Sequence, residues 1–216
     1  MKSAIAGLGL AALLVVTNAH AGPLSFSNLG DTGTINYSGN IEGADVEGLT
    51  ATTTFRLDQI VDNSFVFDVK IENTANHLWE DARISRIGLN VDPDVIGVSA
   101  SSPWYAMLGG SVPNGFGAVD MCIGEEKQGG FQCQGGPGGV SKNSVASFLL
   151  TMNFETAPAA VWFDNLVVRW QSLTSETLGF NGDSGTGTPV AVPAPGALAL
   201  LGLGLLGVGL ARRLTS

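Results

Sequence analysis

Alternation of apolar and polar residues is the feature that most limits how this chain can fold. In Ser64–Asn73, the apolar residues Phe65, Phe67, Val69 and Ile71 fall on one face and mostly polar residues fall on the other. A period of two is the pattern of a β-strand with one buried face. The segment is therefore predicted to be a half-buried strand that needs partner strands to complete a sheet.

Other segments of the chain also have strand character. Alternation or β-branched residues mark four further candidates and two weaker ones: Thr50–Leu57, Ala82–Val91, Ser144–Phe154 and Val161–Leu173, then Thr34–Ser38 and Val95–Ala100. After the first 21 residues, no segment before Val190 carries an apolar stripe of helical period over three turns. Short strands separated by Gly, Asn, Asp and Pro clusters predict an all-β fold, an antiparallel β-sandwich or jelly roll.

The first 21 residues are predicted to be a secretory signal peptide. Lys2 supplies a positive start, Ala4–Val16 is apolar, and Ala19–Ala21 has the small-x-small pattern of a cleavage site. We expect cleavage between Ala21 and Gly22. The alternative, an uncleaved N-terminal anchor, needs a longer apolar span.

The C-terminal end predicts a transmembrane helix. Gly196–Ala211 is a continuous apolar run followed by Arg212 and Arg213, a basic pair expected on the cytoplasmic side. With residues 191–195, a helix here approaches the roughly 30 Å hydrocarbon core of a bilayer. A buried core helix, the alternative, would show a polar face. We expect a sorting and anchor segment at residues 192–216, joined by a flexible glycine-rich linker at residues 181–191 to a β-sandwich domain at residues 22–180.

Charge excludes several classes of partner. All 19 acidic residues lie within Gly22–Val192, but only seven of the ten basic residues do, so this region has a net charge of −12. A domain of this charge repels nucleic acid and anionic lipid surfaces. We therefore expect no nucleic-acid partner, and membrane attachment only through the C-terminal helix.

Cys122 and Cys133 are the only cysteines and enclose ten residues. In an oxidising compartment such a pair is most simply a disulfide, and two free thiols are the alternative. A zinc site would need more ligands than these cysteines and the remote His77. The sequence predicts no metal and no cofactor.

Catalytic patterns are weak. His77 lies in a polar turn, and no G-x-S-x-G elbow is present, so nucleophilic catalysis is not indicated. The acidic pairs are Glu80-Asp81, Asp92-Pro93-Asp94 and Glu125-Glu126. We interpret each pair as a solvated turn. The sequence predicts no catalytic residues.

Aromatic residues offer a different kind of site, because exposed Trp and Tyr rings stack on sugars. Trp79, Trp104 and Tyr105 lie in or near predicted turns and are candidate glycan contacts. The alternative is that they close the ends of the sandwich. Trp162 and Trp170 fall within strand patterns and are expected in the core.

Three features stand together near the C-terminus: the motif Val192-Pro193-Ala194-Pro195, the apolar run, and the pair Arg212-Arg213. This combination resembles the PEP-CTERM sorting signal, whose tripeptide is usually Pro-Glu-Pro. The resemblance implies cleavage near the prolines by a membrane-embedded exosortase, which releases or re-anchors the domain, in a bacterium that makes exopolysaccharide. Prolines break a helix at the membrane surface and leave an extended segment for a protease.

A second resemblance covers more of the chain. Arg83–Pro93, Cys122, Cys133–Gly139 and Phe163–Ser172 resemble the cistern family of PEP-CTERM proteins. That resemblance implies a compact extracytoplasmic domain with paired cysteines and no known reaction.

Together these features favour an exported, non-enzymatic structural protein. We expect it first at the inner membrane and then, after processing, at the cell surface or in the exopolysaccharide matrix. The alternative is a carbohydrate-binding module that uses Trp104, Tyr105 and Trp79. A hydrolase built on one of the acidic pairs is the third hypothesis.

Overall fold

The computed structural model describes residues 22–125 and 133–190, and these residues form strands without helices. The strands are β1 Leu24–Phe26, β2 Thr32–Ile41, β3 Ala44–Val61, β4 Ser64–Asn73, β5 Asp81–Asp92, β6 Val95–Ala100, β7 Trp104–Leu108, β8 Ser111–Val112, β9 Gly117–Ala118, β10 Met121–Glu125, β11 Val140–Ser141, β12 Val145–Phe154, β13 Val161–Ser175 and β14 Phe180–Pro189. The predicted strands all form. Ser64–Asn73 is found with the predicted bounds, and Phe65, Phe67, Val69 and Ile71 are its buried face.

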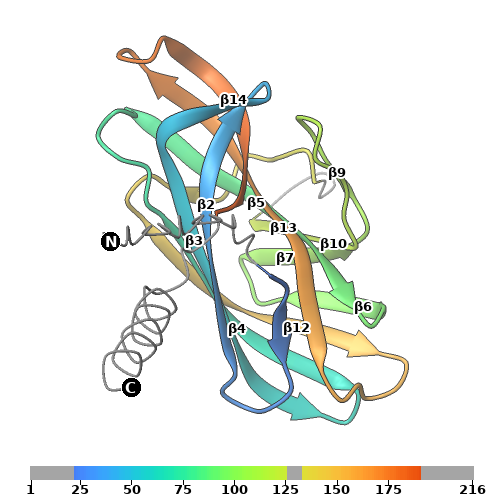
Figure 1. Ribbon diagram of the computed structural model, residues 1–216. Coiled ribbons are helices and arrows are strands. Elements are labelled where there is room, and N and C mark those ends of the chain that lie inside the picture. The colour runs from blue at the N-terminus through green and yellow to red at the C-terminus, as the bar shows by residue number, and fades with distance from the viewer. Residues whose placement is uncertain (1–21, 126–132, 191–216) are drawn as a thin grey trace, which may run out of the picture. The chain divides into compact units, whose positions relative to one another are not determined.

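One antiparallel sheet of twelve strands contains nearly all of this structure (Figure 1). Its order is β6-β12-β4-β3-β2-β14-β13-β5-β10-β7, with β1 added to β13 and β11 added to β5. The two end strands, β6 and β7, are consecutive in the chain. The Trp104 ring of β7 stacks on the Phe148 ring of β12, the neighbour of β6, at 4.5 Å between centroids. The sheet is therefore nearly closed on itself.

The main core lies between the two halves of this curved sheet. Phe163 of β13 contacts Phe26, Phe55 and Phe67 at centroid distances of 4.9, 5.2 and 5.0 Å, so strands from opposite halves of the sheet order meet face to face. The all-β, antiparallel expectation is confirmed. The strands follow one continuous hydrogen-bonded path, whereas a sandwich or jelly roll has two separate sheets. The buried-face periodicity is the same in both arrangements, so it could not distinguish them.

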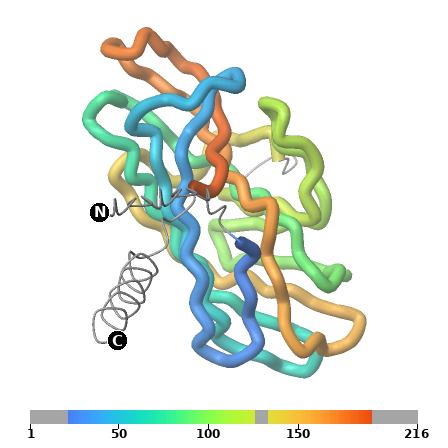
Figure 2. Tube along the Cα trace, in the orientation of Figure 1, coloured from blue at the N-terminus to red at the C-terminus, as the bar shows by residue number. Residues whose placement is uncertain are grey.

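The prediction of a flexible linker is wrong for Asn181–Pro189. These residues belong to β14, which pairs with β13 on one side and with β2 on the other. Figure 2 shows β2 and β14 running side by side, although they are far apart in the sequence. A Cβ atom at Gly187 would overlap the Trp170 ring, so glycine allows the strand to lie against a large buried side chain.

The signal-peptide, sorting-motif and membrane-helix predictions fall on residues outside the described part of the chain. Within residues 22–125 and 133–190, no helix is long and apolar enough to cross a membrane.

Candidate functional site

Three arginines gather on the face of β5 and β13 that points away from the main core. Arg86 is 1% exposed and Arg169 is 7% exposed, and Arg83 is half-buried nearby. Arg86 and Arg169 are register partners, so two cations lie side by side. Like charges directly opposite each other destabilise a sheet. This arginine cluster therefore requires acceptors that offset the repulsion.

Backbone carbonyls supply those acceptors. Arg86 Nη2 donates to the Gly135 carbonyl at 3.0 Å and Nη1 to its neighbour Ser85 at 2.7 Å. Arg169 Nε donates to Gln134 at 3.1 Å. Most of these acceptors belong to one segment, residues 133–139, here called the glycine loop.

Three more contacts fix the glycine loop. Arg83 Nη1 donates to the Gly136 carbonyl at 2.8 Å, and the Gly136 amide donates to Gln171 Oε1 at 3.0 Å. The Gly139 amide donates to a carboxylate oxygen of Glu125 at 3.0 Å. The sheet thus holds this loop by its carbonyls and by its amides.

Glycine is required where the loop meets the arginines. A Cβ atom at Gly136 would overlap Arg86 Nη2, and a Cβ atom at Gly139 would overlap the Ile84 carbonyl oxygen. Gly139 also has a φ of 134°, a conformation that side chains disfavour. The glycine-rich sequence is therefore a packing requirement of the arginine cluster.

The predicted disulfide is present in the structure. Cys122 and Cys133 are bonded, with their Cα atoms 5.8 Å apart. Both cysteines are buried in a second small apolar cluster with Val112, Val119 and Val167. The disulfide joins the start of the glycine loop to β10.

Burial lowers the pKa of the Arg169 guanidinium. Burial also lowers the pKa of Arg83, and the charges of Asp81 and Glu125 oppose that effect. An arginine remains charged through such shifts because its ordinary pKa is so high. The three arginines donate to backbone carbonyls of the glycine loop, an arrangement suited to fixing backbone.

Two of the three candidate glycan contacts are buried, which corrects the prediction for them. Trp79 is 0% exposed, and its Nε1 donates to the Glu47 carbonyl at 3.0 Å. Trp104 is 5% exposed and belongs to the core. Each ring is covered by a phenylalanine: Trp79 stacks on Phe180 at 5.4 Å, and Trp104 stacks on Phe148. Tyr105, the next residue of β7, is 48% exposed.

The remaining tryptophans differ from each other. Trp170 is fully buried, as expected for the core. Trp162 is 40% exposed, so the expectation of a core position is wrong for it. Trp162 lies on the outward face of β13, between the buried Val161 and Phe163.

The residues considered for catalysis, His77 and the three acidic pairs, are in different surroundings. His77 is exposed in a turn, as predicted. Glu80 is exposed and accepts a hydrogen bond from the Glu176 amide at 3.0 Å, and Asp81, Asp92 and Asp94 are exposed. Of the third pair, Glu125 holds the glycine loop and residue 126 is outside the described part. Across residues 22–125 and 133–190, no three His, Cys, Asp or Glu side chains are placed to hold a metal ion.

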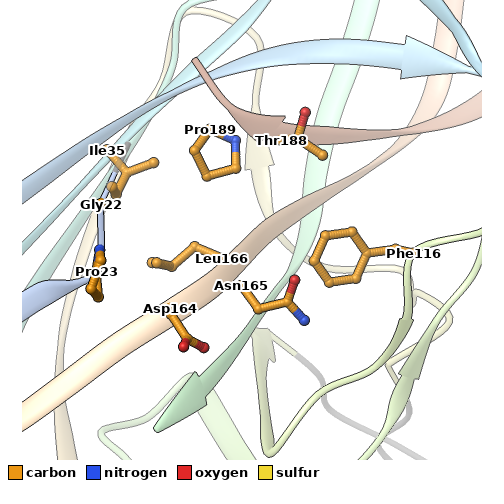
Figure 3. Close-up of a pocket in the computed structure, with 9 residues that line it drawn as sticks. All are labelled: Gly22, Pro23, Ile35, Phe116, Asp164, Asn165, Leu166, Thr188 and Pro189. Atoms are coloured by element: carbon orange, nitrogen blue, oxygen red, sulfur yellow. The ribbon is translucent and has the colours of Figure 1, made fainter. Parts of the chain in front are cut away.

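A cavity of about 410 Å³ lies where the two ends of the described chain meet (Figure 3). Gly22 and Pro23 line it from the beginning of the chain, and Thr188 and Pro189 line it from the end of β14. We call it the terminal cavity. The sequence pattern does not reveal this cavity, because its C-terminal wall is β14, whose local sequence predicts a linker.

An irregularity in β13 forms the floor of the terminal cavity. The pairing of β13 with β5 shifts register between Asp164 and Val167. Asn165, within this bulge, has a φ of 46°, a conformation that Asn tolerates better than most residues. Asp164, Asn165 and Leu166 line the cavity. The bulge lies between the parts of β13 that pair with β1 and with β14.

Comparison with known proteins finds one similarity. Residues 191–213 match a family model described as the PEP-CTERM protein-sorting motif. The matched range begins directly after the last described residue and contains the Val192–Pro195 motif and the Arg212-Arg213 pair. No curated protein and no solved structure matches the chain. The PEP-CTERM assignment is confirmed, and the narrower cistern assignment is not.

Proposed function

We propose that this PEP-CTERM protein is a non-enzymatic structural protein of the bacterial surface, processed by exosortase and associated with the exopolysaccharide matrix. The observation that carries the proposal is the sorting motif at residues 191–213. The motif follows the folded domain without a spacer, since Val190 still donates a backbone hydrogen bond to the Asn36 carbonyl at 2.8 Å. A domain joined so closely to a sorting signal is the cargo of that signal.

The internal construction of the domain supports a structural role. A disulfide joins the start of the glycine loop to β10, and the buried Arg86 and Arg169 donate to backbone carbonyls of the same loop. Such contacts give a rigid domain that withstands an oxidising environment outside the cytoplasm. The net charge of −12 on Gly22–Val192 favours solubility in a hydrated matrix.

The proposal is tested by expressing the full chain in two matched bacterial strains, with and without exosortase. We expect a shorter product in the medium or at the surface only when exosortase is present. In its absence, the full-length tail should remain with the membrane fraction. A chain of identical length and location in both strains would contradict the proposal.

Matched variants of the motif sharpen this test. Replacing Pro193 and Pro195 with alanine should block the exosortase-dependent shortening, because the segment could then continue as a helix. Thr188→Ala, an exposed change outside the motif, is the control and should be processed like the original chain. Ala194→Glu restores the usual Pro-Glu-Pro tripeptide and should be processed at least as fast.

A further inference from the structure

An exposed aromatic ring lies next to the terminal cavity. Trp162 is 40% exposed on the outward face of β13, and Asp164, which lines the cavity, is the next residue on that face. Two residues along a strand span roughly 7 Å. On the neighbouring strand β1, Ser25 is the register partner of Trp162, and Pro23 lines the cavity. The ring and the cavity are therefore adjacent parts of one surface.

The terminal cavity combines apolar walls with polar groups (Figure 3). Its volume of about 410 Å³ lies within the range of small-molecule sites, roughly 300–1,000 Å³. Three ring side chains contribute to the apolar walls: Phe116, Pro23 and Pro189. The polar groups belong to Asp164, Asn165 and Thr188, whose side chains make no hydrogen bond or ion pair within residues 22–125 and 133–190. These donors and acceptors are thus available to a ligand.

This combination matches the chemistry of an uncharged sugar ring. A pyranose has an apolar C–H face, which stacks on aromatic rings, and hydroxyl groups at its edge, which carboxylates and amides bind. An entirely apolar ligand would bury the Asp164 carboxylate without a hydrogen bond, at a cost in free energy. An anionic ligand would meet the carboxylates of Asp164 and of Asp92, the register partner of Trp162, whereas no basic residue is among the described residues that line the cavity.

We propose that Trp162 and the terminal cavity form a binding site for two neighbouring residues of an uncharged polysaccharide chain. One sugar ring stacks on Trp162, and the next lies in the cavity. There its hydroxyl groups donate to the Asp164 carboxylate and accept from the Asn165 amide. The inference rests on the proposed function, because it specifies how the domain associates with a polysaccharide matrix.

Isothermal titration calorimetry on the full chain measures the affinity. The protein is solubilised with a detergent that has no sugar headgroup, because such a headgroup would compete for the site. The probes are four uncharged hexasaccharides: cellohexaose, laminarihexaose, mannohexaose and xylohexaose. Hexagalacturonate is the anionic control. We expect at least one uncharged probe to bind, and hexagalacturonate to bind at least about tenfold more weakly than that probe.

Substitutions assign the binding to this surface. Trp162→Ala should weaken the affinity by about tenfold or more, because it removes the stacking ring. Asp164→Asn should weaken it by about tenfold, because hydrogen bonds to a charged acceptor are stronger than those to a neutral one. Tyr105→Ala is the matched control, since Tyr105 is a 48% exposed aromatic residue that does not line the cavity. Its affinity should stay within about twofold of the original. The urea midpoint of each variant checks that the fold is intact.

Acrylamide quenching of tryptophan fluorescence gives a second readout. Trp162 is the accessible tryptophan of the domain, because Trp79, Trp104 and Trp170 are each 5% exposed or less. A bound probe should therefore protect the fluorescence of the unaltered chain from acrylamide. In Trp162→Ala the same probe should have no effect on quenching.

Three results would overturn the inference. Failure of all four uncharged probes to bind would remove the site. Binding that Trp162→Ala and Asp164→Asn leave unaltered would place it elsewhere on the protein. Tighter binding of hexagalacturonate than of any uncharged probe would contradict the class of ligand. None of these results touches the exosortase-dependent shortening of the chain, which is measured separately in the two matched strains and decides the proposed function.

Discussion

Replacing Arg86 with methionine tests whether the arginine cluster holds the glycine loop. Methionine keeps most of the aliphatic stem but removes the guanidinium donors, among them those that bond the Gly135 carbonyl at 3.0 Å and the Ser85 carbonyl at 2.7 Å. A hydrogen bond to a charged group contributes about 1.5–3 kcal/mol. These two shortest bonds alone give about 3–6 kcal/mol, and relief of the repulsion from Arg169 offsets part of that loss. We expect a net loss of about 3 kcal/mol in the free energy of unfolding.

The matched control is the same substitution at an exposed arginine. Arg56 on β3 bonds to Asp58 at 2.7 Å, with its side chain 47% exposed. An exposed ion pair is worth less than about 1 kcal/mol, so Arg56→Met should change stability little. Arg86→Lys keeps the charge but has a different donor geometry, and should fall between the other two.

Urea unfolding of the purified domain, residues 22–190, measures these differences. A loss of about 3 kcal/mol corresponds to a melting temperature about 6–12 °C lower for a domain of this size. The reasoning is refuted if Arg86→Met and Arg56→Met unfold within about 0.5 kcal/mol of each other, a difference typical of ordinary surface substitutions.

Three further predictions address other parts of the domain. Replacing both Cys122 and Cys133 with serine should cost about 2–3 kcal/mol in urea unfolding, as closing a loop of this length predicts; unchanged stability would contradict a structural role for the disulfide. Gly187→Ala should lower the free energy of unfolding by about 1–3 kcal/mol, because the added Cβ atom overlaps the buried Trp170 indole. Gly97→Ala on β6 is the control and should cost less, because a Cβ atom there meets its nearest neighbour at 3.4 Å. Equal losses would contradict the packing argument. The backbone amides of Ser27 and Asn28 lower the pKa of Asp31 from 3.8. The stabilisation by its carboxylate is therefore present above pH 3.8 and is lost as the pH falls through the lower pKa of the folded state. Asp31→Asn should remove this part of the acid dependence of the urea midpoint, and an unaltered pH profile would contradict the prediction.

Sequence periodicity was sufficient for the strands that have one apolar face. Ser64–Asn73 alternates cleanly, and its bounds were predicted correctly. Phe180–Pro189 was not recognised as a strand because its glycines leave few side chains to alternate. The close contact between Gly187 and Trp170 explains those glycines, but it depends on a partner strand that the local sequence does not reveal.

The arginine cluster was missed for a related reason. Arg86 and Arg169 alternate with apolar residues, so each resembles an exposed position on the polar face of a strand. That face is covered by the glycine loop, a long-range contact that periodicity cannot detect. The available signal was the combination of charged residues in apolar strands with a stapled loop rich in glycine. The glycan-contact prediction is wrong for Trp79 because a polar turn sequence does not show that its ring is buried against Phe180.

The most direct test of the account is the intact mass of the protein recovered without reductant from membranes and from medium. We predict a surface or medium species that begins at Gly22, ends near Pro195, and is lighter by the two thiol hydrogens lost in one disulfide. That mass would support export, the cysteine pair and tail removal together. A chain that still carries Arg212-Arg213 in every fraction would contradict exosortase processing, and the protein would then be a permanently anchored one.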